Sequence, residues 1–340
     1  KLNRIFLLSF FIYPICMGAP NKDLDIQKNA NERIQEYRTG TVILKLSNGE
    51  GNSFTPRTQF HVEQTQHAFL FGCNIFKFNK SRNEIENALY AQHFSDLFNF
   101  ATLPFYWWGE SENPKRNDKN WRERVIEWCK ENQIILKGHT LAWNWKDPGW
   151  LPNDPDMAYD LQMARIEKIV NQYKDDILIW DVVNEATAYD RQFPRKNAPI
   201  LTAAIDQMGV DQYLIDAFQA ARRRNQNAEL IINDFKTGRK FKTTVLEPMV
   251  IGDFPLCDVI GIQSHMHNGY WGSDRIWTLC EKFKEFGRPI HFTEISIVSG
   301  QKSGEKWETN PEEEKTQAKQ VVDLYTILFS NPNVEAITWW

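Results

Sequence analysis

Eight short apolar segments recur between residue 68 and the end of the chain, and they constrain the fold more than any other feature. They cover residues 68–75, 97–105, 133–143, 176–184, 229–234, 258–264, 288–296 and 334–340. Apolar runs of this length are typical of strands that are buried on both faces of a parallel sheet. Segments with a helical pattern lie between them and cover residues 84–98, 121–132, 155–173, 212–224, 241–251, 275–286 and 311–329.

Eight strands, each followed by a helix except the last, predict a single (β/α)8 TIM barrel. Two of the helices begin with capping signals, Asp154-Pro155 and Asn310-Pro311. An open, doubly wound sheet is the structural alternative, but no G-x-G-x-x-G motif follows the first strand. The chain ends at Trp340, at the tip of the eighth strand and without an eighth helix. We therefore expect the natural chain to continue beyond this residue.

The first 19 residues have the pattern of a secretory signal peptide. Lys1 and Arg4 precede an apolar stretch over residues 5–13, and the small residues Gly18 and Ala19 follow. The apolar stretch is far shorter than the roughly 20 residues that a membrane-spanning helix needs. We therefore expect a secreted, extracellular protein that is not attached to a membrane once the signal peptide has been cleaved.

Residues 20–67 form an N-terminal extension, and residues 68–340 form the barrel domain. Within the extension, residues 41–67 predict a β-hairpin with an Asn48-Gly49 turn. The four cysteines after the signal peptide are widely spaced, which predicts neither a zinc knuckle nor a dense disulfide scaffold. The net charge of −4 lacks the basic field that a nucleic-acid partner would require. We expect a monomer.

Polar and aromatic residues stand at the ends of the predicted strands. In such a barrel the C-terminal strand ends meet on one face, where the chemistry takes place. Two of these residues, Glu185 and Glu294, lie on nearly opposite strands and can face each other. Such a pair is what cleavage of a glycosidic bond requires, because one acid protonates the leaving oxygen and the other carboxylate attacks or activates water. The strand-end residues are His139, Trp143, Asn184, Glu185, Asn233, Asp234, Gln263, His265, His267, Glu294, Trp339 and Trp340.

Single residues in this set also have ordinary structural interpretations. A glutamate at a strand end is often a solvated or ion-paired loop residue. His265 and His267 can be hydrogen-bonded structural histidines, although an H-x-H pair on a strand also places both rings on one side, as some metal sites require. A metal-dependent barrel hydrolase is therefore one alternative, but no further cluster of histidines accompanies the pair.

The joint order of the strand-end segments is more specific than any single residue. The segments are GHTLAW, WDVVNEA, IGIQSH, HFTEIS and AITWW, in this order along the chain. In these positions they resemble glycoside hydrolase family 10, the family of retaining endo-β-1,4-xylanases. The resemblance covers roughly residues 68–340 and includes both of the family's catalytic segments.

This resemblance implies a role for each matching residue. Glu185 matches the general acid/base, Glu294 matches the nucleophile, and Asn184 matches the residue that holds the 2-hydroxyl of the sugar. The other implied substrate-binding residues are His139 and Trp143, which line the −1 subsite; Gln263 and His265, which position the nucleophile and the −1 sugar; and Trp340, which forms a wall for the sugar ring. The resemblance implies neither a cofactor nor a metal.

The sequence departs from the family at the end of the second strand. Many members carry a Glu-Asn pair and a Lys there, which bind the −2 and −1 sugars, whereas this chain has Trp107, Trp108 and Glu110 in the stretch ATLPFYWWGESE. Asn144 also stands where many members have His. These changes put the −2 subsite in doubt, so a retaining glycosidase for another β-linked glycan and a non-catalytic carbohydrate-binding barrel are alternatives. The function that the resemblance implies is hydrolysis of xylan.

Overall fold

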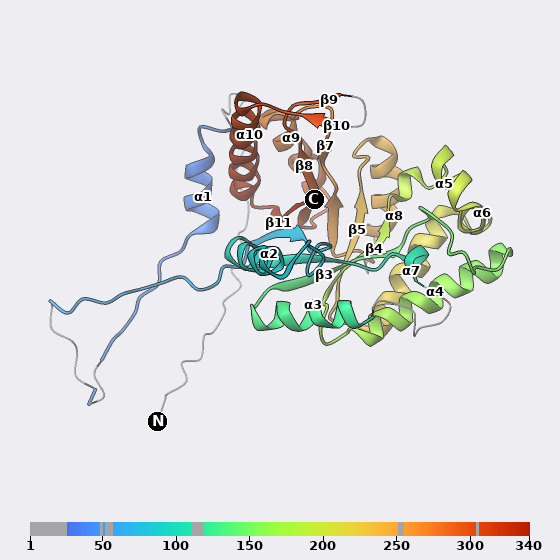
Figure 1. Cartoon of the computed structure of the whole chain (residues 1–340), viewed down its shortest axis with the longest axis horizontal. Coiled ribbons are helices and arrows are strands. Elements are labelled where there is room, and N and C mark those ends of the chain that lie inside the picture. The colour runs from blue at the N-terminus through green and yellow to red at the C-terminus, as the bar shows by residue number, and fades with distance from the viewer. Residues whose placement is uncertain (1–25, 48–49, 52–56, 111–118, 251–254, 304–305) are drawn as a thin grey trace.

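The computed structural model describes residues 26–47, 50–51, 57–110, 119–250, 255–303 and 306–340. The predicted signal peptide, residues 1–19, lies outside the described residues, and so does the predicted Asn48-Gly49 turn. Within the described ranges the chain folds around one closed parallel sheet, with helices on its outer side (Figure 1).

The sheet is a barrel of eight parallel strands, which confirms the predicted (β/α)8 fold. Strand β11 pairs with β1 on one side and with β8 on the other, and this pairing closes the barrel. A two-residue strand, β7 (His265–Met266), extends the pairing at the end of β8. The eight barrel strands are β1 (Leu70–Asn74), β2 (Phe100–Pro104), β3 (Ile135–Ala142), β4 (Ile179–Asn184), β5 (Glu229–Asp234), β6 (Val259–Ile262), β8 (Ile290–Ile297) and β11 (Val334–Trp339).

Each predicted helix is present on the outside of the barrel. The segment predicted at residues 241–251 starts as a π-helical stretch, Phe241–Leu246, and continues as α8 (Glu247–Val250). The other predicted helices are α2 (Glu84–Leu97), α3 (Lys119–Glu131), α4 (Pro155–Gln172), α7 (Val210–Arg224), α9 (Ser273–Lys284) and α10 (Pro311–Ser330).

Both predicted capping signals form. The side chain of Asp154 accepts hydrogen bonds from the backbone N–H groups of Asp156 and Met157, at 3.0 and 3.1 Å. Asn310 and Glu313 form a reciprocal capping box at the start of α10. These caps satisfy N–H groups that have no partner inside the helix, and they fix where each helix leaves its strand.

Three α-helices of the described residues were not predicted. Helices α5 (Gln192–Asn197) and α6 (Pro199–Met208) lie between β4 and α7, and α1 (Ala30–Arg38) lies beside α10 in Figure 1. The Arg38 guanidinium fixes α1 in place by donating to the carbonyl oxygens of Phe329, Asn331 and Val334. These helices pack mainly against other helices, α1 on α10 and α6 on α4 and α7, and sequence periodicity does not record such contacts.

The described flanks of the predicted hairpin, residues 39–47 and 57–67, contain no strand, although Ser47 has an isolated bridge. Their apolar side chains, such as Val42, Ile43 and Val62, are largely exposed. A two-stranded hairpin that packs on nothing is only marginally stable in water. With its turn outside the described residues, the hairpin stays a prediction.

The layer between the barrel strands and the outer helices is packed, and one glycine shows how tightly. A Cβ atom on Gly138 of β3 would lie 2.1 Å from the indole of Trp180 on β4. Gly138 thereby lets the fully buried Trp180 ring fill the space between the two strands. No described helix is long and apolar enough to cross a membrane.

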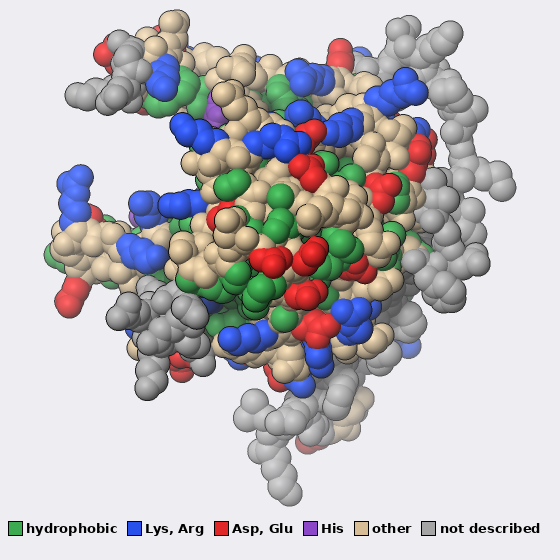
Figure 2. Space-filling model, turned by 90° about the vertical axis from the view of Figure 1, so that its right-hand side faces the viewer, with side chains coloured by type: hydrophobic (Ala, Val, Ile, Leu, Met, Phe, Trp, Pro, Cys, Tyr) green, Lys and Arg blue, Asp and Glu red, His purple; other side chains and the backbone are tan. Residues whose placement is uncertain are grey.

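The outer helices form a surface of mixed charge on the side that carries α4 to α7. On this face Lys and Arg side chains are interspersed with Asp and Glu side chains (Figure 2). Such mixing is usual for a solvated surface and draws no particular ligand. The chemistry of the molecule must therefore be sought at the barrel mouth.

Candidate active site

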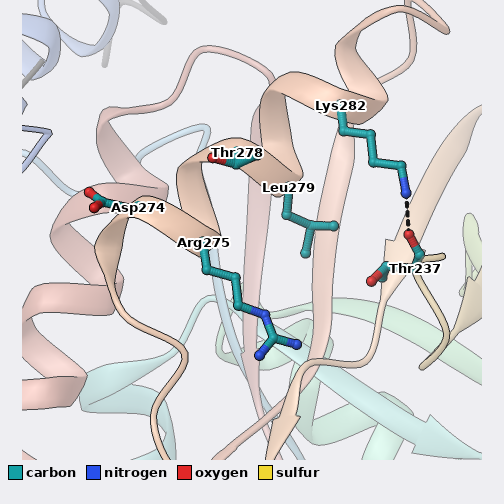
Figure 3. Close-up of a pocket in the computed structure, with 6 residues that line it drawn as sticks. All are labelled: Thr237, Asp274, Arg275, Thr278, Leu279 and Lys282. Carbon is teal, nitrogen blue, oxygen red and sulfur yellow. Dashed lines mark hydrogen bonds between the residues drawn. The ribbon is translucent and has the colours of Figure 1, made fainter. Parts of the chain in front are cut away.

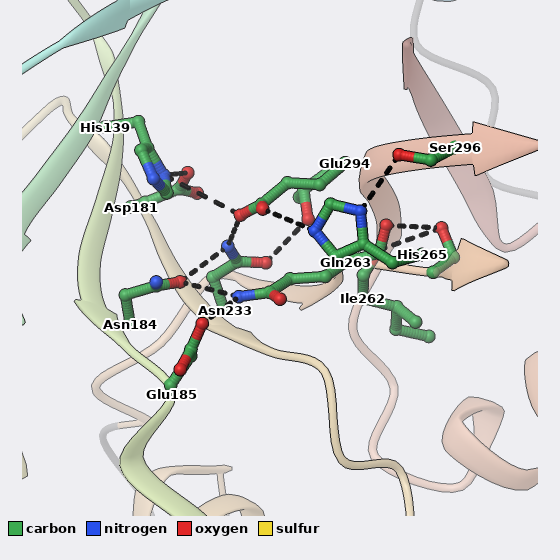
Figure 4. A network of polar contacts seen from close by, with 12 residues as sticks. His139, Asp181, Asn184, Glu185, Asn233, Ile262, Gln263, His265, Glu294 and Ser296 are labelled. Atoms are coloured by element: carbon green, nitrogen blue, oxygen red, sulfur yellow. Dashed lines mark hydrogen bonds and ion pairs between the residues drawn. The ribbon is translucent and has the colours of Figure 1, made fainter. Parts of the chain in front are cut away.

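Glu185 lies directly after β4 and has a backbone conformation that residues other than glycine rarely adopt. Its φ is +59°, in the left-handed region, and its N–H donates to the carbonyl of Asn233 on β5 at 2.8 Å. The turn that follows is fixed by Thr187, whose N–H donates to the Asp234 carboxylate at 2.9 Å. Left-handed residues that neighbouring strands hold in place are concentrated at functional sites. This backbone directs the Glu185 carboxylate toward the middle of the mouth, as Figure 4 shows.

Glu294, on β8, is held from two sides. Its Oε1 accepts a hydrogen bond from Nδ2 of Asn233 at 2.8 Å, and its Oε2 lies 3.1 Å from Nε2 of His265. The other ring nitrogen of His265 contacts the Ser296 hydroxyl at 3.0 Å. Because protein oxygens engage both nitrogens of His265, its geometry favours a hydrogen-bonding role over a metal ligand. Among the described residues there is also no group of three or more possible metal ligands.

Amide side chains connect the two carboxylates into one network (Figure 4). Gln263 Nε2 lies 3.3 Å from Glu185 Oε1 and 3.2 Å from Asn184 Oδ1. Asn233 Nδ2 bridges Asn184 Oδ1, at 2.8 Å, to Glu294. Two donors therefore occupy the Asn184 oxygen and fix the orientation of its amide.

The two carboxyl groups differ in environment, and that difference suits different roles. Burial raises the pKa of Glu185 to about 7. The Arg191 guanidinium and the Gln263 amide oppose this shift, whereas the charges of Glu294 and Asp234 reinforce it. Glu294 accepts a hydrogen bond from Asn233 and lies beside His265. The arrangement therefore supplies an acid that remains largely protonated below about pH 7 next to a second carboxyl group that hydrogen bonds hold in place.

His139 extends the network toward β3. Its Nδ1 lies 2.7 Å from Oδ2 of Asp181, which also lies 2.8 Å from Nζ of the fully buried Lys137. Burial by itself would raise the pKa of Asp181, but Lys137 and His139 hold it below its usual value. The ionised Asp181 thus fixes the orientation of the His139 ring, which lies 4.0 Å from Oε1 of Glu294.

Aromatic rings form walls around the polar network. Trp340 lies edge-on to His139, with ring centroids 5.2 Å apart, and its backbone N–H donates to Ile295 at 2.9 Å. Trp143 packs against Trp145 at 4.8 Å and lies 6.1 Å from Tyr106. The structure therefore brings all eight predicted site residues to the same end of the barrel.

The end of β2 is built differently from the family pattern. Glu110 does not face the mouth, because Arg165 of α4 binds its carboxylate with two hydrogen bonds, at 2.7 and 3.1 Å. Trp107 is buried against Trp150, whereas Trp108 stacks on Tyr106 with centroids 4.6 Å apart. The residues that replace the family's polar −2 group are thus one structural carboxylate and a set of aromatic rings.

Asn144, the other departure, is also structural. Its Nδ2 donates to the carbonyl of Tyr189 and to the Thr202 hydroxyl, both at 2.8 Å. It therefore connects the segment after β3 to the segment after β4 and to α6, and it makes no contact with either catalytic candidate.

A separate hollow lies outside the mouth. It is formed between α9 and the segment after β5, where Lys282 donates to the backbone carbonyl of Thr237 (Figure 3). Its other lining residues are Asp274, Arg275, Thr278 and Leu279. It contains none of the predicted site residues.

Asn233 and Arg191, each in contact with one of the two carboxyl groups, are not among the predicted site residues. The sequence identifies Asn233 only as a polar strand end, and it gives no signal for Arg191, whose Nη2 lies 2.5 Å from Oε2 of Glu185. The position of Asn233 next to Asp234 at the end of β5 was a signal that could have identified it. Arg191 lies in the segment between β4 and α5, whose path the sequence pattern does not predict.

An eight-stranded parallel barrel with two carboxylates joined by amides at its mouth has the structure of a glycoside hydrolase. Residues 64–340 match the family described as glycosyl hydrolase family 10, and the chain belongs to that family. This confirms the family predicted from the strand-end segments.

Curated relatives agree with this assignment, and solved structures share the fold. The chain is 27% identical over 282 residues to the endo-1,4-beta-xylanase A of Caldicellulosiruptor saccharolyticus. The aligned region covers 77% of this chain and 79% of the relative. It is 25% identical over 301 residues to an endo-1,4-beta-xylanase/feruloyl esterase of Xylanibacter ruminicola. That aligned region covers 80% of this chain but only 41% of the relative. The crystal structure of xylanase 10B from Thermotoga petrophila RKU-1 with xylobiose has the same fold, with a TM-score of 0.64 and 24% identity over 80% of this chain and 82% of the other.

Proposed function

We propose that this chain is a retaining endo-β-1,4-xylanase that hydrolyses internal bonds of xylan. The observation that carries the proposal is the pair of Glu185, which follows β4, and Glu294, which lies on β8, with two strands between β4 and β8. The two side chains are joined through Gln263, Asn184 and Asn233. Family membership and the xylanase relatives support the choice of substrate.

The reaction proceeds by double displacement. In the first step an ionised Glu294 oxygen attacks the anomeric carbon, and Glu185 gives its proton to the departing glycosidic oxygen. In the second step Glu185 takes a proton from water, water attacks the same carbon, and the bond to Glu294 breaks. When Glu294 is esterified its charge is lost, so the repulsion that raises the pKa of Glu185 falls and Glu185 can act as the base.

The pH dependence of kcat/KM should follow from the ionisation of the proposed acid, Glu185. Because Glu185 must be protonated in the free enzyme and its pKa is raised to about 7, kcat/KM should fall about tenfold per pH unit above that value. The initial product should retain the β configuration, which proton NMR during early hydrolysis can follow. An initial α-product from a β-linked substrate would refute retention.

A second candidate function is that of a retaining glycosidase for another β-linked glycan. The aromatic side chains at the end of β2 are the observation that favours this candidate. Tyr106 and Trp108 stand there in place of the polar groups that hold a −2 xylose, so stacking replaces hydrogen-bond selection in this subsite. Release of reducing sugar from xylan, arabinoxylan and carboxymethylcellulose separates the two functions. Faster turnover of carboxymethylcellulose than of xylan would overturn the first proposal.

The proposal includes export of the protein as a monomer. The charged, apolar and small-residue pattern of residues 1–19 supports a cleaved signal peptide. N-terminal sequencing of protein from the culture medium should find a start close to residue 20, and gel filtration with light scattering should give the mass of one chain. Retention of residues 1–19 or a mass of two chains would contradict it.

A further inference from the structure

Arg191 makes a direct contact with the candidate acid/base that the two-carboxylate mechanism does not use. It precedes α5, and its Nη2 lies 2.5 Å from Oε2 of Glu185. The other Glu185 oxygen faces Gln263 at 3.3 Å. Only 10% of the Glu185 side chain and 33% of the Arg191 side chain are exposed, so solvent screens this ion pair less than it screens a surface pair.

Aromatic rings from two other loops hold the Arg191 guanidinium in place. The Cζ atom lies 5.4 Å from the Trp145 ring, which follows β3, and 5.2 Å from the Phe235 ring, which follows β5. Trp145 is itself packed on Phe193, with ring centroids 4.1 Å apart. A planar guanidinium between two rings keeps its direction, because each ring face attracts the cation. The contact with Glu185 is therefore fixed by three consecutive loops of the barrel.

The charge of Arg191 favours ionisation of Glu185, whereas the neighbouring charges of Glu294 and Asp234 disfavour it. Glu294 on β8 and Asp234 on β5 both disfavour the ionised form of Glu185, as burial does. Tyr106, after β2, remains neutral because burial raises the pKa of its phenol far above the usual value. On the outer side, Asp190 and Lys240 lie 3.8 Å apart and largely compensate each other. Arg191 is thus the cation that stabilises the Glu185 carboxylate.

We propose that Arg191 is a positioning residue that orients Glu185 and stabilises its ionised form for the second step of the reaction. This inference rests on the proposed acid/base role of Glu185. The first step needs Glu185 protonated and the second needs it ionised, so the cation favours deglycosylation at the expense of glycosylation. Without it, Glu185 would remain protonated to higher pH and would act as a base only in more alkaline solution.

The test compares Arg191→Gln, Arg191→Lys and a matched control, Arg195→Gln. Arg195 lies four residues further on in α5 and pairs with Asp206 at 2.9 Å, without contact to Glu185. For Arg191→Gln we expect the basic limb of kcat/KM on xylo-oligosaccharides to move up by about one pH unit. The acid limb of kcat on a dinitrophenyl xylobioside, where deglycosylation limits the rate, should move up as well. Arg191→Lys and Arg195→Gln should keep both limbs near the wild-type positions, and unmoved limbs in Arg191→Gln would overturn the proposal.

Carbon-13 NMR can follow the pH titration of the Glu185 carboxyl group directly, in the absence of substrate. The Glu185 signal is assigned by its loss in Glu185→Gln. The titration midpoint should rise in Arg191→Gln, and an unchanged midpoint overturns the inference even if the enzyme hydrolyses xylan. A wild-type protein that hydrolyses no β-glycan contradicts the proposed function instead, whatever the midpoint. If Arg191→Gln does not fold, Phe235→Leu removes one ring of the clamp and should raise the midpoint by a smaller amount; an unchanged midpoint there also overturns the inference.

Discussion

The two sides of the barrel mouth use different chemistry. At the ends of β4, β5, β6 and β8, amides and carboxylates form one hydrogen-bonded network around Glu185 and Glu294. At the end of β2, the corresponding position holds stacked rings, and the nearby carboxylate of Glu110 is bound by Arg165. Because each loop of such a barrel is anchored by its own strand, one side of the mouth can change without moving the other. If the proposed function is right, the reaction depends mainly on the polar side of the mouth and the sugar preference mainly on the aromatic side.

The largest loss of activity should follow from substitution of the proposed nucleophile, Glu294. Glu294→Gln keeps the hydrogen bonds of the network nearly intact but removes the attacking oxygen anion, so kcat on xylan should fall by roughly 10⁵-fold. Circular dichroism and the thermal midpoint should stay close to wild type. Glu314→Gln, an exposed change in the first turn of α10, is the matched control and should retain full activity. A Glu294→Gln rate within about tenfold of wild type would remove Glu294 from this role.

The next largest effect should depend on the leaving group. Glu185→Ala removes the proton donor, so the rate on xylan should drop by about 10²- to 10⁴-fold. A dinitrophenolate leaving group needs no proton, so the first step on a dinitrophenyl xyloside should be much less affected. Pre-steady-state release of dinitrophenolate measures that step directly. Equal losses on both substrates would show that Glu185 is not the acid.

A smaller effect should follow from the amide that connects the two acids. Asn233→Ala removes the hydrogen bond to Glu294 Oε1, a charged contact whose loss costs about 1.5–3 kcal/mol. We therefore expect kcat/KM to fall roughly 10- to 100-fold while both carboxylates remain in place. Asn225→Ala, at the end of α7 and outside the mouth, serves as the comparison. If Asn233→Ala were as active as wild type, the network would not contribute to catalysis.

The smallest effect should come from the aromatic side of the mouth. Trp108→Ala removes one partner of the stack with Tyr106, which is worth about 0.5–1.5 kcal/mol. We expect KM on long xylo-oligosaccharides to rise about 2- to 10-fold with kcat nearly unchanged, because the proposed role of this ring is to stack on sugar and not to take part in bond cleavage. A loss of kcat comparable with that of Asn233→Ala would remove the distinction between the two sides.

The barrel was predictable from the sequence because each strand is buried on both faces and therefore apolar. The eight strands lie within the predicted segments to about three residues, apart from one residue at the end of β8. Helices α5 and α6 were missed because α6 is stabilised by packing against α4 and α7, and α5 by packing against α6, which no local pattern records.

The site was predictable where its residues close the strands, as Glu185 and Glu294 do. The role of Asn233 could not be predicted, because it depends on an amide that reaches two neighbouring strands at once. The binding of Glu110 by Arg165, 55 residues away in sequence, is likewise a consequence of the fold. Side-chain pairing across loops requires the three-dimensional structure.

The central claim is that Glu294 forms the covalent bond to the sugar. A dinitrophenyl 2-deoxy-2-fluoro-xylobioside should trap that intermediate, because the fluorine slows both steps and the good leaving group restores the first. Peptide mapping by mass spectrometry should then find the fluoro-xylobiosyl group on Glu294, with activity lost in proportion to labelling. A label on another residue, or full turnover without any covalent adduct, would contradict the account.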